Sequence, residues 1–234
     1  MTQAKHIGIA AVSAEGAALC YRTICIEGAA ILGPHAHPQV TMHTYPLADH
    51  MRAIDAGRWD EVGALLLSSA AKLVAAGADF LICPDNTAHE GLDLIRAQSP
   101  APWLHIAEEV AAVAAECRFR RVGILGTRYL MEGPVYPAKL ASVHIAFELP
   151  DPADRARINA TIFDELVYGR FEDESRRHFQ RVIGQLGDRG CDAVVLGCTE
   201  IPLLISETDS PLPVIDSTRT LARAALRRAT GREP

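Results

Sequence analysis

The sequence lacks several features that define large classes of protein. Its 234 residues carry a formal net charge of −6, so the chain as a whole is not a natural partner for nucleic acids or other polyanions. It contains no Gly-x-Gly-x-x-Gly segment and no Walker lysine, which argues against the common nucleotide-binding loops. No window approaches the roughly 18 apolar residues of a membrane span, so we expect no membrane partner.

Targeting and metal signals are also missing. Residues 1–12 hold a short apolar run typical of a first strand, without the apolar stretch of roughly 7–15 residues found in a secretory signal. The six cysteines form no Cys-x-x-Cys pair and no dense framework, which excludes a usual zinc site or disulfide scaffold. His35, His37 and His43 lack metal-ligand spacing, and surface or loop roles are expected for them. These observations favour a reducing, cytoplasmic location and no bound metal.

What the chain does contain is an ordinary globular composition, with 49% hydrophobic and 22% charged residues. Buried-strand patterns alternate with longer helical patterns, which predicts an α/β fold built on parallel sheets covered on both faces. The predicted strands are residues 7–12, 40–45, 80–83, 103–106, 122–126, 144–148, 193–196 and 214–215. The predicted helices include residues 59–76, 108–116, 158–168 and 174–188, and the basic run 219–232 is expected to be the solvated face of a terminal helix.

The sequence also repeats itself. Any α/β protein reuses a glycine-plus-apolar-strand theme, but here the spacings between the matches agree as well. This predicts two similar parallel-sheet βα lobes related by a pseudo-twofold axis, with residues 1–112 plus 214–234 in one lobe and 113–213 in the other. The three matches are Gly8-Ile9 with Gly123-Ile124, residues 77–82 with 190–195, and residues 102–105 with 213–216.

Ligands of open parallel sheets bind at the carboxyl ends of the strands, so the residues just after the matched strands are the candidate site. Carrying the second match forward in register aligns Asp85 with Cys198. If the lobes face each other, these two side chains lie on opposite sides of one cleft. That arrangement suits the removal of a proton from one face of a carbon atom and its return to the other.

At these residues the sequence resembles the aspartate/glutamate racemase family. The segment from Asp85 to His89 is similar to the family's first motif, Cys or Thr followed by Asn-Thr, a small residue or Met, and His. The segment from Gly197 to Pro202 matches the second motif. Further similar stretches are residues 125–127, Met131, Tyr136, residues 164–166 and residues 214–218. The resemblance implies two α/β lobes with the active site in the cleft between them, a small amino-acid or carboxylate substrate, no metal or pyridoxal phosphate cofactor, and a homodimer.

Two departures from the family pattern affect the expected chemistry. Asp85 stands where the family has Cys or Thr, and Cys83 lies two residues upstream, roughly 6–7 Å along a strand and separated by Pro84. Cys83 therefore does not simply replace the missing thiol. Aspartate-specific members carry an arginine shortly before the position of His37, and residues 33–36 contain none. A substrate range broader than aspartate is expected.

The chemistry explains why these residue types matter. A cysteine, with a reference pKa of about 8.5, can remove or donate a proton near neutral pH. Cys198 is expected at the start of a helix, where backbone N–H groups favour the thiolate; the alternative is a packed core cysteine. Asp85 is ordinarily ionised. Either its surroundings raise its pKa and allow two-way transfer, or it serves mainly as a base or as a partner of the substrate ammonium; the alternative is a simple turn residue.

The remaining candidate residues surround these two. Backbone and hydroxyl donors are expected to hold the substrate carboxylate, although helix capping is an alternative use of a serine or threonine. Glu200 either partners Cys198 or is the acid that a first helical turn prefers. His89, Cys83 and Thr44 are candidates for supporting roles, and His89 would orient or protonate. The expected substrate-binding residues are Ser13, Asn86, Thr87, Thr127, Thr199 and Glu200.

Three functions stay open at this point. The first is an amino-acid racemase or epimerase that uses Asp85 and Cys198. The second is a decarboxylase or cis–trans isomerase of the same superfamily, which keeps a single catalytic cysteine and would be favoured by an apolar pocket near Tyr129 and Leu130. The third is a protein that binds a small carboxylate without turning it over.

Overall fold

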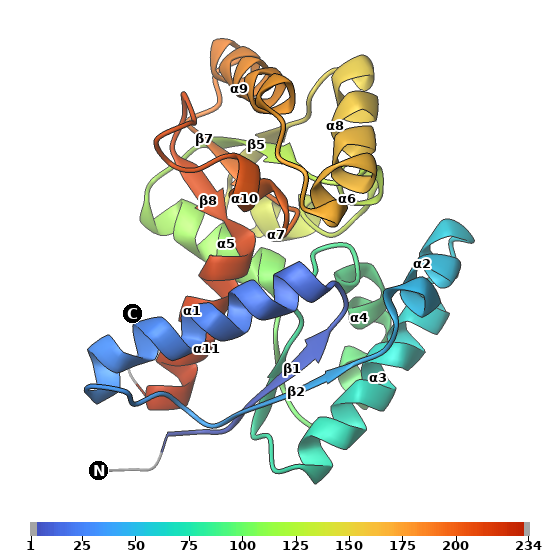
Figure 1. The fold of residues 1–234 in the computed structure, drawn as a ribbon, viewed down its shortest axis with the longest axis vertical. Helices are drawn as coiled ribbons and strands as arrows, with labels where there is room; N and C mark the ends of the chain where they lie inside the picture. Colours follow the sequence, from blue (N-terminus) through green and yellow to red (C-terminus); the bar gives the residue numbers. More distant parts are fainter. Residues whose placement is uncertain (1–3, 232–234) are drawn as a thin grey trace. The chain divides into compact units, whose positions relative to one another are not determined.

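The computed structural model describes residues 4–231, which form two compact units (Figure 1). Unit 1 comprises the described residues up to Ile106 and from Thr218 onward, and unit 2 comprises Ala107–Ser217. The sequence placed these borders after residues 112 and 213. Each unit contains one four-stranded parallel sheet with flanking helices, and the predicted α/β fold class is confirmed.

Unit 1 has the strand order β2-β1-β3-β4, with all neighbours parallel. Its helices cover both faces of the sheet (Figure 1). Arg232, the last residue of the predicted basic run, lies outside the described residues. The elements are β1 (Ile7–Ala11), α1 (Ala14–Leu32), β2 (Val40–Thr44), α2 (Leu47–Asp55), α3 (Trp59–Ala75), β3 (Phe80–Ile82), α4 (His89–Ile95), η1 (Arg96–Gln98), β4 (Trp103–Leu104) and α11 (Ser217–Thr230), which begins at the last residue of unit 2.

Unit 2 repeats this plan with the order β6-β5-β7-β8, again all parallel. The eight predicted strands are thus all present, although their ends differ by up to two residues. The elements are α5 (Ile106–Glu116), β5 (Arg121–Leu125), α6 (Arg128–Glu132), α7 (Pro137–Ser142), β6 (Ala146–Glu148), α8 (Pro152–Asp164), η2 (Leu166–Tyr168), α9 (Asp173–Asp188), β7 (Ala193–Leu196), α10 (Ile201–Leu204) and β8 (Val214–Asp216).

The internal repeat extends to individual hydrogen bonds. In unit 1 the amide of Asp79 donates to the His6 carbonyl at 2.9 Å, and Asp79 Oδ2 accepts from the His6 amide at 2.7 Å. In unit 2 Asp192 makes the same two bonds with Arg121, at 2.8 and 3.2 Å. Each aspartate thereby links the starts of two neighbouring central strands, β1 and β3 in unit 1 and β5 and β7 in unit 2.

A left-handed glycine ends the helix before each of these strands. Gly77 has φ 97° and follows α3, and Gly190 has φ 85° and follows α9. Such positive φ values cost a residue with a Cβ far more than they cost glycine. The matching Gly-x-Asp patterns in the sequence therefore mark the same helix-to-strand turn in both units.

The cores follow the alternation expected of strands buried on both faces. In β7, Val194 and Leu196 pack in the cluster formed with α8 and α9, whereas Ala193 and Val195 pack in the cluster formed with α5 and α7. In unit 1, the apolar face of α11 packs on β1 and β3. The predicted terminal helix is present as α11, and at most 1% of each residue is exposed at Leu221, Ala222, Ala225 and Leu226.

The helix predicted over residues 158–168 is wrong at both ends. It begins at Pro152, directly after Asp151, because proline is well suited to the first helical position. It ends at Asp164, since Glu165 leaves helical geometry with φ −122°. A short 3₁₀ turn follows and stops at Gly169, which is left-handed.

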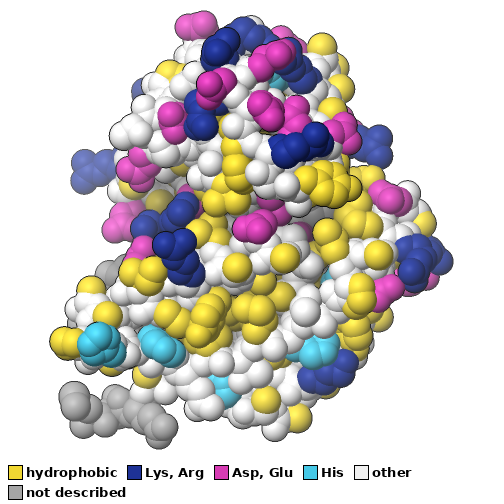
Figure 2. All heavy atoms as spheres, in the orientation of Figure 1, with side chains coloured by type: hydrophobic (Ala, Val, Ile, Leu, Met, Phe, Trp, Pro, Cys, Tyr) yellow, Lys and Arg dark blue, Asp and Glu magenta, His cyan; other side chains and the backbone are white. Residues whose placement is uncertain are grey.

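The types of side chain exposed on the surface differ from one helix to another. Figure 2 shows charged side chains of both signs interspersed over α8 and α9, and hydrophobic side chains gathered over α1. Tyr21 and Ile26 of α1 are 44% and 60% exposed. Across residues 4–231, no helix has the length and apolar character that crossing a membrane requires.

Candidate active site

The strand order places the candidate residues at a special point in each sheet. From β1 the chain moves to β2 on one side, and β3 then lies on the other side of β1, so β1 and β3 flank a topological switch point; β5 and β7 do the same in unit 2. Crevices at such points, at the carboxyl ends of the strands, are where open α/β sheets bind ligands. Ser13 follows β1 and Asp85 follows β3, and Thr127 follows β5 and Cys198 follows β7.

Asp85 is held in a tight turn between β3 and α4. Its Oδ1 accepts a hydrogen bond from the Ala88 amide at 2.9 Å, and its carbonyl oxygen lies 2.7 Å from His89 Nδ1. The carbonyl of Asn86, a residue only 2% exposed, accepts from the His89 amide at 3.2 Å. Asp85 itself is half-buried. Its turn role and a role in chemistry are therefore compatible, because part of the residue stays exposed.

Cys83 supports this turn and does not replace Asp85. Its side chain is fully buried, and its Sγ lies 4.0 Å from the carbonyl oxygen of Asp85. Burial, followed by the nearby charge of Asp85, raises the pKa of the Cys83 thiol well above its usual value. A neutral, enclosed thiol is a poor proton acceptor.

In unit 2, Cys198 and Glu200 form a buried pair. The Cys198 thiol donates to Glu200 Oε2 at 3.0 Å, and the Thr199 hydroxyl donates to the same oxygen at 2.7 Å. Cys198 is 8% exposed, and Thr199 and Glu200 are each 4% exposed. Of the two roles considered for Glu200, the structure supports that of partner to Cys198.

The expected helix start at Cys198 is wrong. The chain bends through residues 198–200, and α10 begins only at Ile201 and lasts four residues. Glu200 precedes it without a side-chain capping bond. The Glu200 carboxylate is thus a hydrogen-bond acceptor for the Cys198 thiol.

Gly197 fixes the approach of this loop to β5. Its amide donates to the Leu125 carbonyl at 2.7 Å. A Cβ at Gly197 would lie 2.4 Å from Leu130 Cδ2 and 3.0 Å from that carbonyl oxygen, so only glycine fits. Leu130 is 2% exposed, and its side chain fills this space.

Tyr136 and Ser217 belong to the stretches that resemble the racemase family, but the sequence suggested no role for them. In the structure both stabilise the loop that follows β7. Ser217 donates to the Leu196 carbonyl at 2.8 Å, at the end of β7. The buried phenol of Tyr136 hydrogen-bonds to Ser217, and burial raises the pKa of Tyr136. The sequence offered no signal for this contact, because Tyr136 and Ser217 lie far apart along the chain.

The other predicted binding residues occupy turns and caps. Ser13 accepts from the Gly16 amide at 3.2 Å as the N-cap of α1, and Thr127 accepts from the Leu130 amide at 3.3 Å as the N-cap of α6. A cap uses the side-chain oxygen as an acceptor, so it is compatible with the hydroxyl donating to an anion. The Thr87 carbonyl accepts from Glu90.

Thr44 and His43 belong to β2. Thr44 is exposed, and its hydroxyl donates to the Tyr45 carbonyl at 2.9 Å. His43 lies within the strand and not in a loop, with Nδ1 3.0 Å from Ser69 Oγ and Nε2 3.2 Å from Lys72 Nζ. Among residues 4–231, no group of three or more His, Cys, Asp and Glu side chains is arranged to hold a metal ion.

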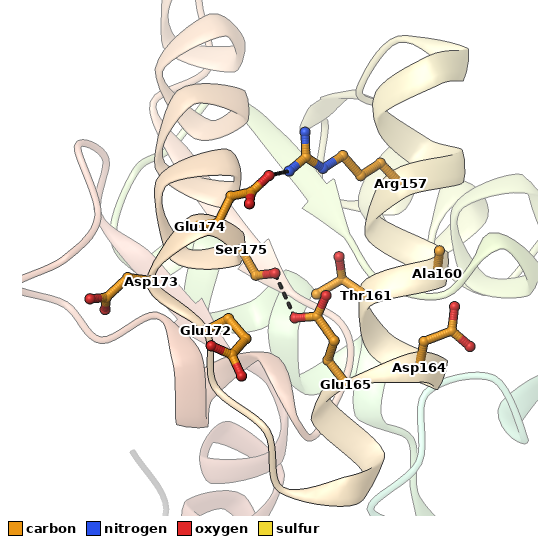
Figure 3. Close-up of a pocket in the computed structure, with 9 residues that line it drawn as sticks. All are labelled: Arg157, Ala160, Thr161, Asp164, Glu165, Glu172, Asp173, Glu174 and Ser175. Atoms are coloured by element: carbon orange, nitrogen blue, oxygen red, sulfur yellow. Dashed lines mark hydrogen bonds and ion pairs between the residues drawn. The ribbon is translucent and has the colours of Figure 1, made fainter.

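A pocket of about 420 Å³ lies between α8 and α9 in unit 2 (Figure 3). Ser175 donates to Glu165 at 2.6 Å, and Arg157 pairs with Glu174 at 2.8 Å. Five carboxylates and one guanidinium line this pocket, so its charge opposes a substrate carboxylate. Residues 164–166 of the racemase-like stretch thus join two helices, and Leu166 is fully buried in the core.

Comparison with known proteins gives a consistent result. The family model described as Asp/Glu/Hydantoin racemase matches residues 9–225. A candidate Asp/Glu racemase from Yersinia pestis has a crystal structure that superposes with a TM-score of 0.88 at 33% identity, covering 97% of this chain and 99% of that one. An aspartate racemase homologue from Pyrococcus horikoshii OT3 shares the fold, with a TM-score of 0.82 at 24% identity over 97% and 99% of the two chains.

Curated relatives include enzymes with named activities. The broad specificity amino-acid racemase RacX of Bacillus subtilis (strain 168) is 25% identical over 170 residues, 71% of this chain and 72% of that protein. A glutamate racemase of Pseudomonas aeruginosa is 29% identical over 173 residues, 71% of this chain. That alignment spans only 61% of the glutamate racemase, less than two thirds of its length.

Proposed function

Because this chain belongs to the Asp/Glu/hydantoin racemase family, we propose that it is a cofactor-independent amino-acid racemase, an isomerase that interconverts L and D forms at the α-carbon. Asp85 of unit 1 and Cys198 of unit 2 act on the same substrate, one on each face of that carbon. The observation that carries the proposal is the buried contact of 3.0 Å between Cys198 Sγ and Glu200 Oε2.

The Cys198–Glu200 pair gives the thiol a route to both protonation states. When Cys198 acts as a base, its thiol proton passes to Glu200, and the resulting thiolate removes the α-proton. The electrons of the broken C–H bond move into the substrate carboxylate. When Cys198 acts as an acid, the thiol gives its proton to the carbanion, and the negative charge stays on sulfur.

Asp85 handles the proton on the opposite face. As a carboxylate it removes the α-proton of one enantiomer, while the Cys198 thiol protonates the opposite face. As a carboxylic acid it protonates its own face of the planar intermediate that forms when Cys198 removes the α-proton of the other enantiomer. Its Oδ1 accepts from the Ala88 amide, which favours the charged form. Proton removal by Asp85 therefore starts from the Asp85 carboxylate and the Cys198 thiol, and proton removal by Cys198 starts from the Asp85 carboxylic acid.

The substrate carboxylate is held by donors in the loops after the central strands. Asn86, Thr87, Ser13 and Thr127 supply amide and hydroxyl groups, and preorganised donors of this kind often contribute the largest share of barrier lowering. The hydroxyl of Thr199 already donates to Glu200. Its contribution to binding therefore comes from its backbone N–H.

The substrate range is expected to be broad. Residues 33–36 lack the arginine seen before this position in aspartate-specific members, and one relative is named a broad specificity amino-acid racemase. The named relatives are racemases, which favours racemisation over decarboxylation. A buried thiol–carboxylate pair also exceeds what a protein that only binds a carboxylate needs. A cytoplasmic homodimer completes the proposal, and analytical ultracentrifugation tests the dimer.

The decisive experiment measures solvent deuterium entering Cα across a panel of L and D amino acids, with chiral chromatography of the products. We expect exchange and inversion by the wild type, loss of inversion in Cys198→Ala and Asp85→Asn, and no change in Cys117→Ala, which alters an exposed cysteine of unit 2. Absence of exchange with every amino acid would contradict the proposal. Turnover of disubstituted malonates without racemisation would identify a decarboxylase.

A further inference from the structure

We propose that His89 is a positioning residue that orients the peptide of Asp85 and does not itself transfer protons. This inference rests on the proposed racemase function. It is carried by two hydrogen bonds of one fully buried imidazole. His89 Nδ1 lies 2.7 Å from the Asp85 carbonyl oxygen, and the Ile106 amide donates to His89 Nε2 at 3.1 Å.

These two bonds determine the tautomer of His89. A backbone amide can only donate, so Nε2 must be the unprotonated nitrogen of the ring. A carbonyl oxygen can only accept, so Nδ1 must carry the proton. His89 is therefore a neutral imidazole whose donor points at Asp85 and whose acceptor points at Ile106, the first residue of α5.

Acting as an acid would break this arrangement. Protonation of Nε2 would put two N–H groups, those of His89 and Ile106, against each other in a site with no exposed surface on the histidine. The neighbouring His105 is also fully buried, and the two rings meet edge to face with centroids 4.4 Å apart. Placing a positive charge on the buried His89 ring would therefore carry a large desolvation cost.

Asp85 is therefore held at two points, its side-chain carboxylate and its backbone carbonyl. The Ala88 amide holds the carboxylate through Oδ1, and His89 holds the carbonyl of the same residue. His89 also connects this turn to the start of α5, which follows β4. The direction of the Asp85 carboxylate thus depends on two elements that are separate in sequence.

Two substitutions separate the two bonds of His89. His89→Asn places an amide near the Nδ1 position, so it keeps a donor for the Asp85 carbonyl and loses the bond to Ile106. His89→Gln reaches the Nε2 position, so it keeps an acceptor for the Ile106 amide and loses the bond to Asp85. Both remove the imidazole and leave no proton-transfer group near neutral pH.

We expect His89→Asn to keep kcat within about tenfold of the wild type, the scale of one neutral hydrogen bond. We expect His89→Gln to lower kcat about 10²-fold, the scale of a small misplacement of a reacting group. In both variants KM and the limbs of the pH–rate profile should stay in place. His6→Asn is the matched control, since His6 is a buried histidine directly before β1, at the opposite end of the same sheet.

The assay is kcat, KM and pH profile of racemisation, with thermal denaturation of each variant. Equal kcat values in His89→Asn, His89→Gln and wild type, with lowered melting temperatures, would overturn the inference in favour of a purely structural role. Loss of one pH limb in both variants would overturn it in favour of an acid or base. A wild type without exchange would overturn the proposed function itself, and with it this role.

Discussion

The most informative perturbation of the proposed chemistry is Glu200→Gln. Glutamine has nearly the same size, and its carbonyl oxygen can still accept from Thr199, which donates to Glu200 Oε2 at 2.7 Å. It cannot, however, take the thiol proton that Cys198 directs at the same oxygen from 3.0 Å. Because Glu200 is only 4% exposed, bulk water is a poor replacement for its carboxylate.

The size of the effect follows from that loss. General acid–base groups contribute roughly 10²- to 10⁴-fold to a rate, and we expect kcat to fall within that range, equivalent to about 3–5 kcal/mol of barrier. KM should change little, since Glu200 contacts the thiol. The melting temperature should stay close to that of the wild type, because the packing and the Thr199 bond are retained.

The assay follows racemisation from each enantiomer by circular dichroism, with deuterium wash-in to the unreacted substrate. Because L and D forms have equal free energy, kcat/KM must fall by the same factor in both directions. Wash-in should be lost only for the enantiomer whose α-proton faces Cys198. The control is Glu207→Gln, an exposed glutamate of unit 2. A fall below threefold, or an equal loss of wash-in for both enantiomers, would refute the role given to Glu200.

Three further outcomes follow from the structure. Gly197→Ala should lower the free energy of unfolding by about 1–3 kcal/mol in urea titrations, because its Cβ would lie 2.4 Å from Leu130 Cδ2; an unchanged midpoint would contradict this. In the native protein, iodoacetamide should alkylate exposed Cys117 and spare Cys83, whose pKa is raised by burial, as read by peptide mass spectrometry; native labelling of Cys83 would count against its placement. Burial lowers the pKa of His50 in the folded protein. On acidification His50 therefore becomes protonated at a higher pH in the unfolded chain than in the folded one. The free energy of unfolding should then decrease as the pH drops from about 6.5 through the folded pKa. His50→Gln should remove that part of the slope of stability against pH, and an identical slope would exclude His50 as its source.

The strands and their repeat were open to prediction from the sequence. Near-continuous apolar runs such as 193–196 identified buried strands, and β7 has the same bounds in the structure. The Gly-x-Asp segments before β3 and β7 marked equivalent turns, and Asp79 and Asp192 make equivalent bonds. Periodicity and turn chemistry are local properties, so the sequence carries them directly.

The contacts within the candidate site were harder to predict from the sequence. Glu200 is two residues from Cys198, yet the sequence left open whether it partners the thiol or begins a helix. The helix expected at Cys198 was wrong, because the chain bends before α10 begins. The bond between His89 and the Ile106 amide had no sequence signal, since it joins residues 17 positions apart.

By itself, the sequence determined the α/β class, the two-fold repeat and the racemase family, because burial patterns, turn residues and motif order are written along the chain. Only the tertiary structure decided which carboxylate meets the Cys198 sulfur and which nitrogen of His89 carries the proton. Those choices depend on distances of about 3 Å between groups brought together by packing. Hydrogen bonds depend on direction as well as distance, and neither is set by position along the chain.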